Sequence, residues 1–153
     1  MILNLFTDTV VVEWRIASEL KTVMLLAKNM NGLSAWHLAV MNNNNEVVEK
    51  LWGWGREVQV NLKDDLLLPK DNCGQTAWHL AAESGNIELL WTLWSWGIKV
   101  QVNLKDDILL TKDNNGQTTW HLAAESGNIE LLDNNNNNNH LPPWIRSLDL
   151  FRH

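Results

Sequence analysis

The chain has 153 residues, of which 45% are hydrophobic, and it carries a formal net charge of −6. This apolar content is enough for a packed core and argues against wholesale disorder, whereas the acidic balance argues against binding to nucleic acid or to anionic membranes. The single cysteine, Cys73, excludes an internal disulfide and a cysteine-based zinc site.

The N-terminal segment shows no targeting or membrane signal. Residues 1–6 are apolar, but Asp8 follows closely and no basic stretch precedes them, so they make a poor signal peptide. The apolar run at residues 23–27 is far too short to span a bilayer. We therefore expect a cytoplasmic protein with no membrane partner.

A repeat of 42 residues organises the rest of the chain, because this step separates Gly32, Gly74 and Gly116. Residues 58–90 and 100–132 differ at only four positions, so the unit is duplicated. A weaker match begins at about residue 19, so we expect the chain to start inside one unit, to hold two full periods and to stop early in another. The same step links three tryptophans and three histidines, Trp36, Trp78, Trp120, His37, His79 and His121.

One unit reads as a helical hairpin followed by a connecting segment. Residues 71–74 have turn composition, and the Thr76 hydroxyl is suited to cap a helix over 77–83. A Ser-Gly-Asn break then precedes a second helix from about Ile87. The connecting segment is ambiguous, because residues 100–102 alternate like a strand whereas 104–110 suit another helical turn.

The motif that opens each unit narrows the class of repeat. The period alone suits HEAT or armadillo repeats. The motif instead resembles the ankyrin signature, in which a turn leads into Thr-Pro-Leu-His-Leu-Ala-Ala, and the residues beyond the usual length of about 33 then lie in the connecting segment. Ala77 and Trp78 depart from that signature, which prefers proline and leucine there. In the second unit the motif runs through Asp71, Gly74, Thr76, Ala77, Trp78, His79, Leu80, Ala81, Ala82, Gly85 and Asn86.

These observations predict an all-α fold, an α-solenoid of stacked, ankyrin-like helix-turn-helix units with long connecting loops. We assign residues 29–133 to the repeat array and 1–28 to an N-terminal segment with a partial repeat. Residues 134–153 are assigned to an asparagine tract and a disordered tail.

Two asparagine runs, at residues 42–45 and 134–139, damage the pattern. They are either genuine low-complexity tracts or stand-ins for other residues, and the preserved period favours the second explanation for the first run. Asn45 falls where Ile87 is expected to be buried. A buried, unpaired amide costs roughly 1–3 kcal/mol, so this position predicts a local loss of stability.

The remaining conspicuous residues have structural explanations. Repeat units stack about 10 Å apart, so histidines that recur once per unit are too far apart to share a zinc ion. By the resemblance, each histidine ties its turn to the neighbouring unit through hydrogen bonds.

The adjacent carboxylates at residues 64–65 and 106–107 suit a solvated connector, and no phosphate loop or nucleophile elbow is present. We expect no enzyme activity, no metal and no cofactor, and we expect these recurring tryptophans to lie in the core: Trp36, Trp78, Trp120, Trp52, Trp94, Trp54 and Trp96.

The resemblance implies a protein–protein interaction module of the scaffold or adaptor kind. Its partner would bind the concave surface formed by the turn tips and the outward side of the first helices. The matching positions are acidic or rich in amides, which suits a partner with a basic surface. Trp91 is a further candidate, because its equivalent is Glu49, and it is either an exposed anchor or a chance substitution. The candidate binding residues are Asn72, Cys73, Gln75, Glu83, Ser84, Trp91, Asn114, Asn115, Gln117, Glu125 and Ser126.

An alternative is that the chain is a fragment of a longer ankyrin array without an independent function. Solenoids need polar capping repeats, and neither end of this chain has the composition of a cap. Uncapped apolar ends predict self-association.

Overall fold

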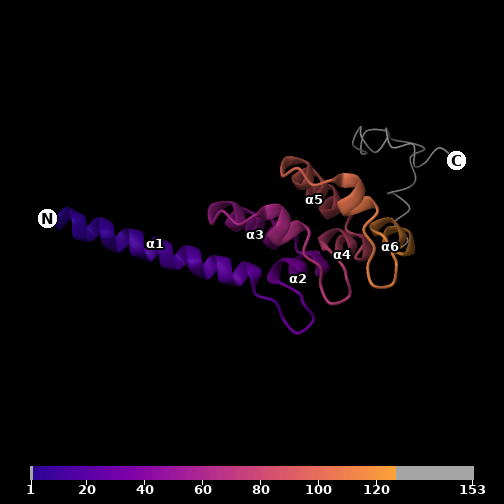
Figure 1. The fold of residues 1–153 in the computed structure, drawn as a ribbon, viewed down its shortest axis with the longest axis horizontal. Helices are drawn as coiled ribbons and strands as arrows, with labels where there is room; N and C mark the ends of the chain where they lie inside the picture. The colour runs from indigo at the N-terminus through magenta and orange to yellow at the C-terminus, as the bar shows by residue number, and fades with distance from the viewer. Residues whose placement is uncertain (1, 127–153) are drawn as a thin grey trace.

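The computed structural model describes residues 2–126, with side chains from Thr9 onward. The repeat array is built from antiparallel helix pairs that stack side by side (Figure 1). The described part of the chain contains no strand, and an isolated bridge joins Lys28 to Ser34. The predicted all-α solenoid is therefore confirmed. The pairs are α2 (Ala35–Met41) with α3 (Asn45–Glu57) and α4 (Ala77–Glu83) with α5 (Ile87–Lys99), and α6 (Thr119–Glu125) begins the next unit.

Each hairpin begins and ends where local chemistry dictates. The Thr76 backbone N–H donates to His79 Nδ1 at 3.2 Å, which satisfies one of the donors left over at the start of α4. Gly85 has a φ of +73°, the left-handed conformation that glycine adopts without steric cost, and it reverses the chain. Asn86 Oδ1 then accepts from the Leu89 backbone N–H at 3.0 Å and caps α5.

The connecting segments contain a single π-helical turn in each unit, η1 (Leu62–Leu67) and η2 (Leu104–Leu109). The helical interpretation of this segment is thus confirmed. The strand interpretation of residues 100–102 is wrong, because Gln101 has a φ of +60° and the Val102 N–H donates to the Gly97 carbonyl oxygen at 2.9 Å. That bond closes the end of α5 and turns the chain back. Each π-helical turn buries two aliphatic side chains, Leu66 and Leu67 in η1 and Ile108 and Leu109 in η2.

Tryptophans join the units through the core. Trp36 and Trp78 are fully buried, at the positions where the ankyrin signature has leucine. The rings of Trp52 and Trp96 stack with centroids 4.5 Å apart and planes 5° apart. Trp36 lies 6.0 Å from Trp52 and 6.1 Å from Trp96, so α2, α3 and α5 meet in one aromatic cluster. The expectation that the recurring tryptophans are core residues is confirmed, with Trp54, Trp96 and Trp120 partly buried at its edge.

The first asparagine run fits the local backbone. Asn43 has a φ of +57°, which asparagine tolerates better than most residues, and Asn44 caps α3 by accepting from the Val47 N–H at 3.2 Å. The expected buried, unpaired amide at Asn45 is wrong. Asn45 is half-buried, and its Oδ1 accepts from Asn86 Nδ2 at 2.7 Å, because Asn86, the equivalent of Asn44 in the next unit, lies beside it.

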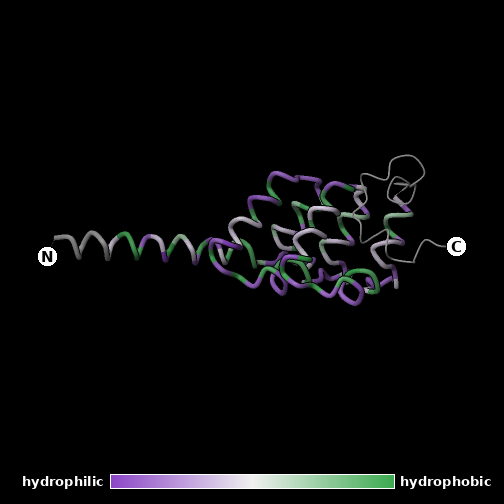
Figure 2. The backbone as a smooth tube through the Cα atoms, turned by 90° about the horizontal axis from the view of Figure 1, so that it is seen from above, coloured by the Kyte–Doolittle hydropathy of each residue, from purple (hydrophilic) through white to green (hydrophobic). Residues whose placement is uncertain are grey.

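The N-terminal segment differs from a partial repeat. It is one continuous helix, α1 (Ile2–Leu26), which runs away from the stack (Figures 1 and 2). Only its C-terminal part follows the repeat register, since Leu25 is fully buried like its equivalent Leu67. Lys21 holds α1 against α3, where its Nζ lies 2.8 Å from Glu57 Oε1 and 5.6 Å from the Trp54 ring centroid.

Within residues 2–126 no helix is both long and apolar enough to cross a membrane. The predicted disordered tail at 134–153, together with the second asparagine run, lies outside the described residues.

Candidate protein-binding surface

The surface is built on turns that an aspartate holds in shape. Asp71 Oδ1 accepts from the backbone N–H groups of Cys73 and Gln75, each at 2.9 Å. Gly74 completes the turn with a φ of +74°. Asp113 forms the same two bonds one unit later, so the two turns present matching side chains to solvent.

Successive turns are bonded to one another at their tips. Asn72 Nδ2 donates to the Met30 carbonyl oxygen at 2.7 Å, and Asn114 Nδ2 donates to the Asn72 carbonyl oxygen at 2.9 Å. Both asparagines were predicted to contact a partner. Their side chains are exposed, but their donor groups already serve the stack. Their first role is therefore to fix the spacing of the turns.

A glutamine on each turn orients a carboxylate on the following helix. Gln75 Nε2 donates to Glu83 Oε2 at 3.1 Å, and Gln117 Nε2 donates to Glu125 Oε1 at 2.6 Å. These amide–carboxylate pairs run along the outward side of α4 and α6. Because Glu83 and Glu125 are exposed, each carboxylate retains oxygen lone pairs for a cationic partner.

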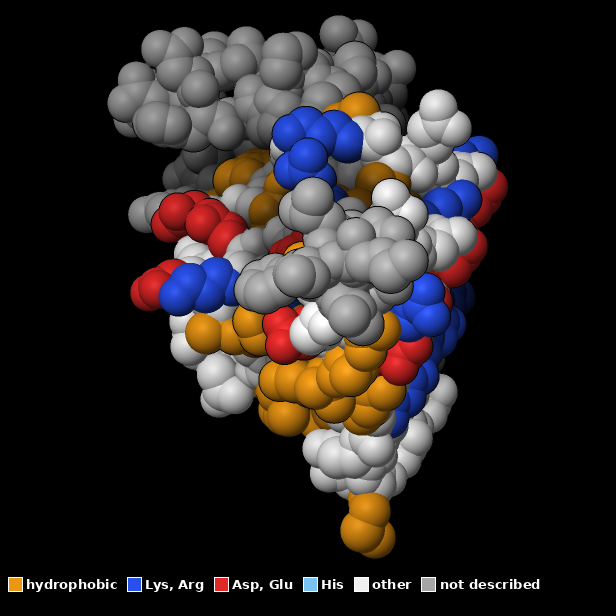
Figure 3. Space-filling view, turned by 90° about the vertical axis from the view of Figure 1, so that its left-hand side faces the viewer, with side chains coloured by type: hydrophobic (Ala, Val, Ile, Leu, Met, Phe, Trp, Pro, Cys, Tyr) orange, Lys and Arg blue, Asp and Glu red, His pale blue; other side chains and the backbone are white. Residues whose placement is uncertain are grey.

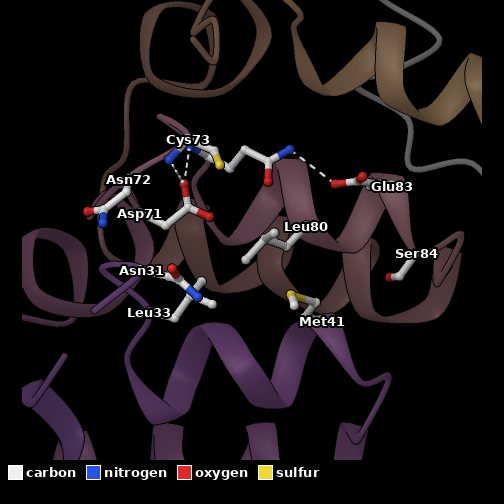
Figure 4. Close-up of a pocket in the computed structure, with 10 residues that line it drawn as sticks. Asn31, Leu33, Met41, Asp71, Asn72, Cys73, Leu80, Glu83 and Ser84 are labelled. Carbon is white, nitrogen blue, oxygen red and sulfur yellow. Dashed lines mark hydrogen bonds between the residues drawn. The ribbon is translucent and has the colours of Figure 1, made fainter. Parts of the chain in front are cut away.

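A groove of about 620 Å³ lies between the first and second units (Figure 4). Five predicted residues of the second unit line it together, namely Asn72, Cys73, Gln75, Glu83 and Ser84. The Ser84 hydroxyl turns back to donate to the Ala81 carbonyl oxygen at 3.1 Å, so it contributes surface and little hydrogen-bonding capacity. The equivalent residues of the third unit lie one unit further along and do not line this groove: Asn114, Asn115, Gln117, Glu125 and Ser126.

The groove also has an apolar part that the sequence-based prediction missed. Leu33 and Met41 of the first unit face Leu80 of the second across it (Figure 4). Leu33 and Met41 occupy the positions of Gln75 and Glu83, because 33 + 42 = 75 and 41 + 42 = 83. This departure from the repeat is the feature of the sequence from which the apolar part of the groove could have been predicted. It makes one side of the groove apolar and the other side acidic.

The comparison with protein families agrees with the turns, caps and hairpins described above. A family model described as ankyrin repeats (3 copies) matches residues 12–106 and 36–139. The chain belongs to the ankyrin-repeat family. No curated protein matches the chain significantly.

The ankyrin histidines link neighbouring units, as the resemblance implied. His37 Nε2 lies 3.1 Å from the Pro69 carbonyl oxygen, and His79 Nε2 lies 3.1 Å from that of Thr111. Burial lowers the pKa of both imidazoles, and this effect outweighs the raising effect of the carbonyl bond. The neutral form fits the geometry, because Nδ1 accepts a backbone N–H while Nε2 donates to the carbonyl oxygen.

Trp91 does not belong to the ankyrin surface that the turns create. The prediction that it is exposed is wrong, because its ring is half-buried and packs against the core from α5. Glu49, its equivalent on α3, is exposed. The difference arises because a tryptophan ring reaches over the neighbouring apolar surface where a glutamate extends into water. Among the described residues, no group of three histidine, cysteine or acidic side chains lies close enough to hold a metal ion.

Proposed function

We infer that this protein is a protein–protein interaction module, as its ankyrin repeats indicate. We propose that it acts as a scaffold or adaptor whose partner binds on the concave side, with the groove between the first two units as the centre of the contact. The observation that carries this proposal is the replacement of the Gln–Glu pair by Leu33 and Met41 in the first unit. Leu33 is 8% exposed and belongs to the core, so the exposed part of this change is Met41 (43%), which adds an apolar side chain to the groove.

The chemistry of the groove specifies the kind of partner segment. Met41, which is 43% exposed, provides contact for one aliphatic or aromatic side chain and adapts well to different shapes, whereas the groove-lining Leu33 (8%) and Leu80 (3%) are core residues beside it. Glu83 lies on the opposite side with its carboxylate oriented by Gln75. A segment with an apolar residue next to Lys or Arg satisfies both sides, so the partner carries a basic surface with an apolar residue within it.

We also propose that the protein resides in the cytoplasm. Cys73 is an exposed free thiol on the rim of the groove, and a reducing compartment keeps such a thiol from forming disulfides with other chains.

The test is selection from a displayed library of random peptides against the full chain. We expect enriched sequences to contain an apolar residue beside Lys or Arg. Met41→Glu, which restores the residue type of the later units, and Glu83→Lys should each weaken the selected peptides by roughly 10-fold. Glu125→Lys is the matched control, because it changes the same position outside the groove and should have a smaller effect. If Met41→Glu and Glu83→Lys leave affinity unchanged, the groove is not the binding site.

A further inference from the structure

Helix α1 has an apolar stripe that faces away from the stack. Its members are spaced by four, four and three residues, which places them on one side of a helix. They are exposed over about half their surface or more: Val12 (50%), Ile16 (52%), Leu20 (58%) and Val23 (63%). Figure 3, which looks along α1 from its N-terminal end, shows hydrophobic side chains gathered at this end of the molecule.

The stripe lies opposite the side of α1 that packs on the array. Leu25 and Lys21 contact the stack, since Leu25 is fully buried and Lys21 pairs with Glu57. Ile16 is nine residues from Leu25, which is about two and a half turns and therefore the opposite face. A surface helix normally directs charged and polar residues outward, so an outward apolar stripe predicts another covering element.

The repeat shows what covers this face elsewhere in the chain. Leu20 occupies the position of Leu62, and the Leu62 side chain lies against Gly55 of α3, with its Cδ2 2.8 Å from the point where a Gly55 Cβ would be. Leu66 lies against the same glycine, and Met24 is its equivalent in α1. Helix α3 therefore covers these positions in the first unit. No described helix does so for α1, in which Met24 is 55% exposed.

The charges beside the stripe select the covering helix and its direction. Arg15 and Glu19 lie one turn apart on the same flank, and neither pairs with another described residue. When two identical helices pack antiparallel, like flanks meet, so Arg15 of each copy lies beside Glu19 of the other and two reciprocal ion pairs form. A parallel pair instead brings this flank against the opposite one, which carries Glu13 and Met24, and leaves Glu19 beside apolar surface.

We propose that the protein forms a homodimer through antiparallel pairing of α1 helices. A twofold axis between Ile16 and Leu20 brings these two residues opposite each other and Val12 opposite Val23, so that every residue of the stripe has an apolar partner. The dimer holds two ankyrin stacks apart at its ends and leaves the groove at Glu83 free on each copy. It is independent of the partner proposed for the groove.

Sedimentation velocity over a dilution series of the full chain tests the dimer. We expect a monomer–dimer equilibrium. Ile16→Glu combined with Leu20→Glu should weaken it by about 100-fold or more, because two apolar contacts per copy become buried charges. Val11→Glu is the matched control, since Val11 lies on the opposite side of the same helix and is also exposed. It should leave dimerisation unchanged. Circular dichroism on each variant establishes that the fold is retained.

A charge exchange tests the direction of pairing. Arg15→Glu alone and Glu19→Arg alone should each weaken the dimer several-fold at low salt, because like charges then meet twice. The double variant restores the reciprocal pairs and should recover the original affinity. In a parallel dimer, Arg15→Glu places two like charges near Glu13, so the double variant stays weak and the antiparallel assignment fails.

Disulfide trapping supplies a second test of direction. In a Cys73→Asn background, which uses the residue that the next unit has at that position, chains with Val12→Cys are mixed with chains with Val23→Cys. Antiparallel pairing predicts disulfides mainly between the two kinds of chain, whereas disulfides within each kind would contradict it.

The proposal is overturned if the protein is a monomer at all concentrations, or if the Ile16 and Leu20 changes leave the dimer affinity unchanged. Binding of the monomer to phosphatidylcholine vesicles through this face would also overturn it and make the stripe a membrane contact.

Discussion

His79 reaches 32 residues along the chain to donate from Nε2 to the Thr111 carbonyl oxygen, at a distance of 3.1 Å. At the same time its Nδ1 accepts the backbone N–H of Thr76. One imidazole thus completes the start of α4 and fastens this helix to Thr111, at the end of the connecting segment that leads into the next turn. Acceptance by Nδ1 requires the neutral ring, because a protonated ring carries a hydrogen on that nitrogen, so the strength of this junction depends on pH.

Stability should fall as the solution becomes acidic. The pKa of His37 and His79 is lowered below 6.5 in the folded chain, so below about that pH the unfolded chain binds more protons than the folded one. The stabilising contribution is therefore complete above about pH 6.5 and is lost as the pH falls through the folded pKa values. Urea denaturation between pH 7.5 and 5 checks this. A midpoint that does not fall towards acid, or that falls equally in His37→Gln combined with His79→Gln, contradicts the assignment.

Replacing His79 should cost more than replacing its sequence equivalent in the third unit. His79→Leu leaves the Thr76 N–H and the Thr111 carbonyl unsatisfied in a buried place, and we expect a loss of about 2–4 kcal/mol. His121 is exposed, and its contacts with Thr118 are local, so His121→Leu should cost about 1 kcal/mol. Thermal or urea unfolding of the two variants measures the difference. Equal losses would mean that the link between units contributes little.

The stacked pair of Trp52 and Trp96 should couple the first unit to the second. In a double-mutant cycle with Trp52→Leu and Trp96→Leu, we expect a coupling free energy of about 0.5–1.5 kcal/mol beyond the separate losses of buried area. Trp14→Leu is the control, because Trp14 is 61% exposed on α1 and should leave the stability of the array unchanged. A coupling close to zero would show that the rings act only through the area that they bury.

Three glycines predict a graded series of effects on the free energy of unfolding. Gly53→Ala should stabilise by about 0.5–1 kcal/mol, because a Cβ there meets nothing and alanine favours the helix. Gly116→Ala should destabilise by about 1 kcal/mol through its φ of +75° alone. Gly74→Ala should cost more than that, because its Cβ would also lie 2.5 Å from Asn114 Oδ1 and 2.9 Å from the Asn114 backbone nitrogen. Chemical denaturation of the three variants gives the order, and a Gly74 effect no larger than that of Gly116 would argue against tight contact between turns.

The repeat allowed most of the array to be predicted. Turn, cap, first helix and second helix are each encoded by local residues such as Gly74 and Asn86, and the step of 42 residues transfers every assignment to the next unit. The course of α1 was not predictable in this way. In the later units the chain leaves the second helix at Gln59 and Gln101, which adopt φ values of +59° and +60°. Glutamine has no special preference for that conformation, so the sequence does not mark the points at which the chain reverses. For the same reason, the sequence does not show that α1 continues without such a reversal.

The candidate surface was predicted only in part, for a physical reason. Comparison of the second and third units identifies the residues that the two share, which are amides and acids such as Gln75 and Glu83. The apolar side of the groove comes from the first unit, where Leu33 and Met41 break the pattern. Trp91 was misjudged because exposure inferred from a glutamate at the matching position does not apply to a ring large enough to reach the core.

The hydrogen bonds between turn tips also give the stack a mechanical property. Each turn donates a side-chain hydrogen bond to the turn before it, from Asn72 Nδ2 to the Met30 carbonyl oxygen and from Asn114 Nδ2 to the Asn72 carbonyl oxygen. Each junction between units also contains packed tryptophans and a histidine bond, so we expect tension along the stack to be shared among these contacts, with the junctions acting in series. We therefore expect an array of this design to extend by one junction at a time under load, rather than to unfold all at once.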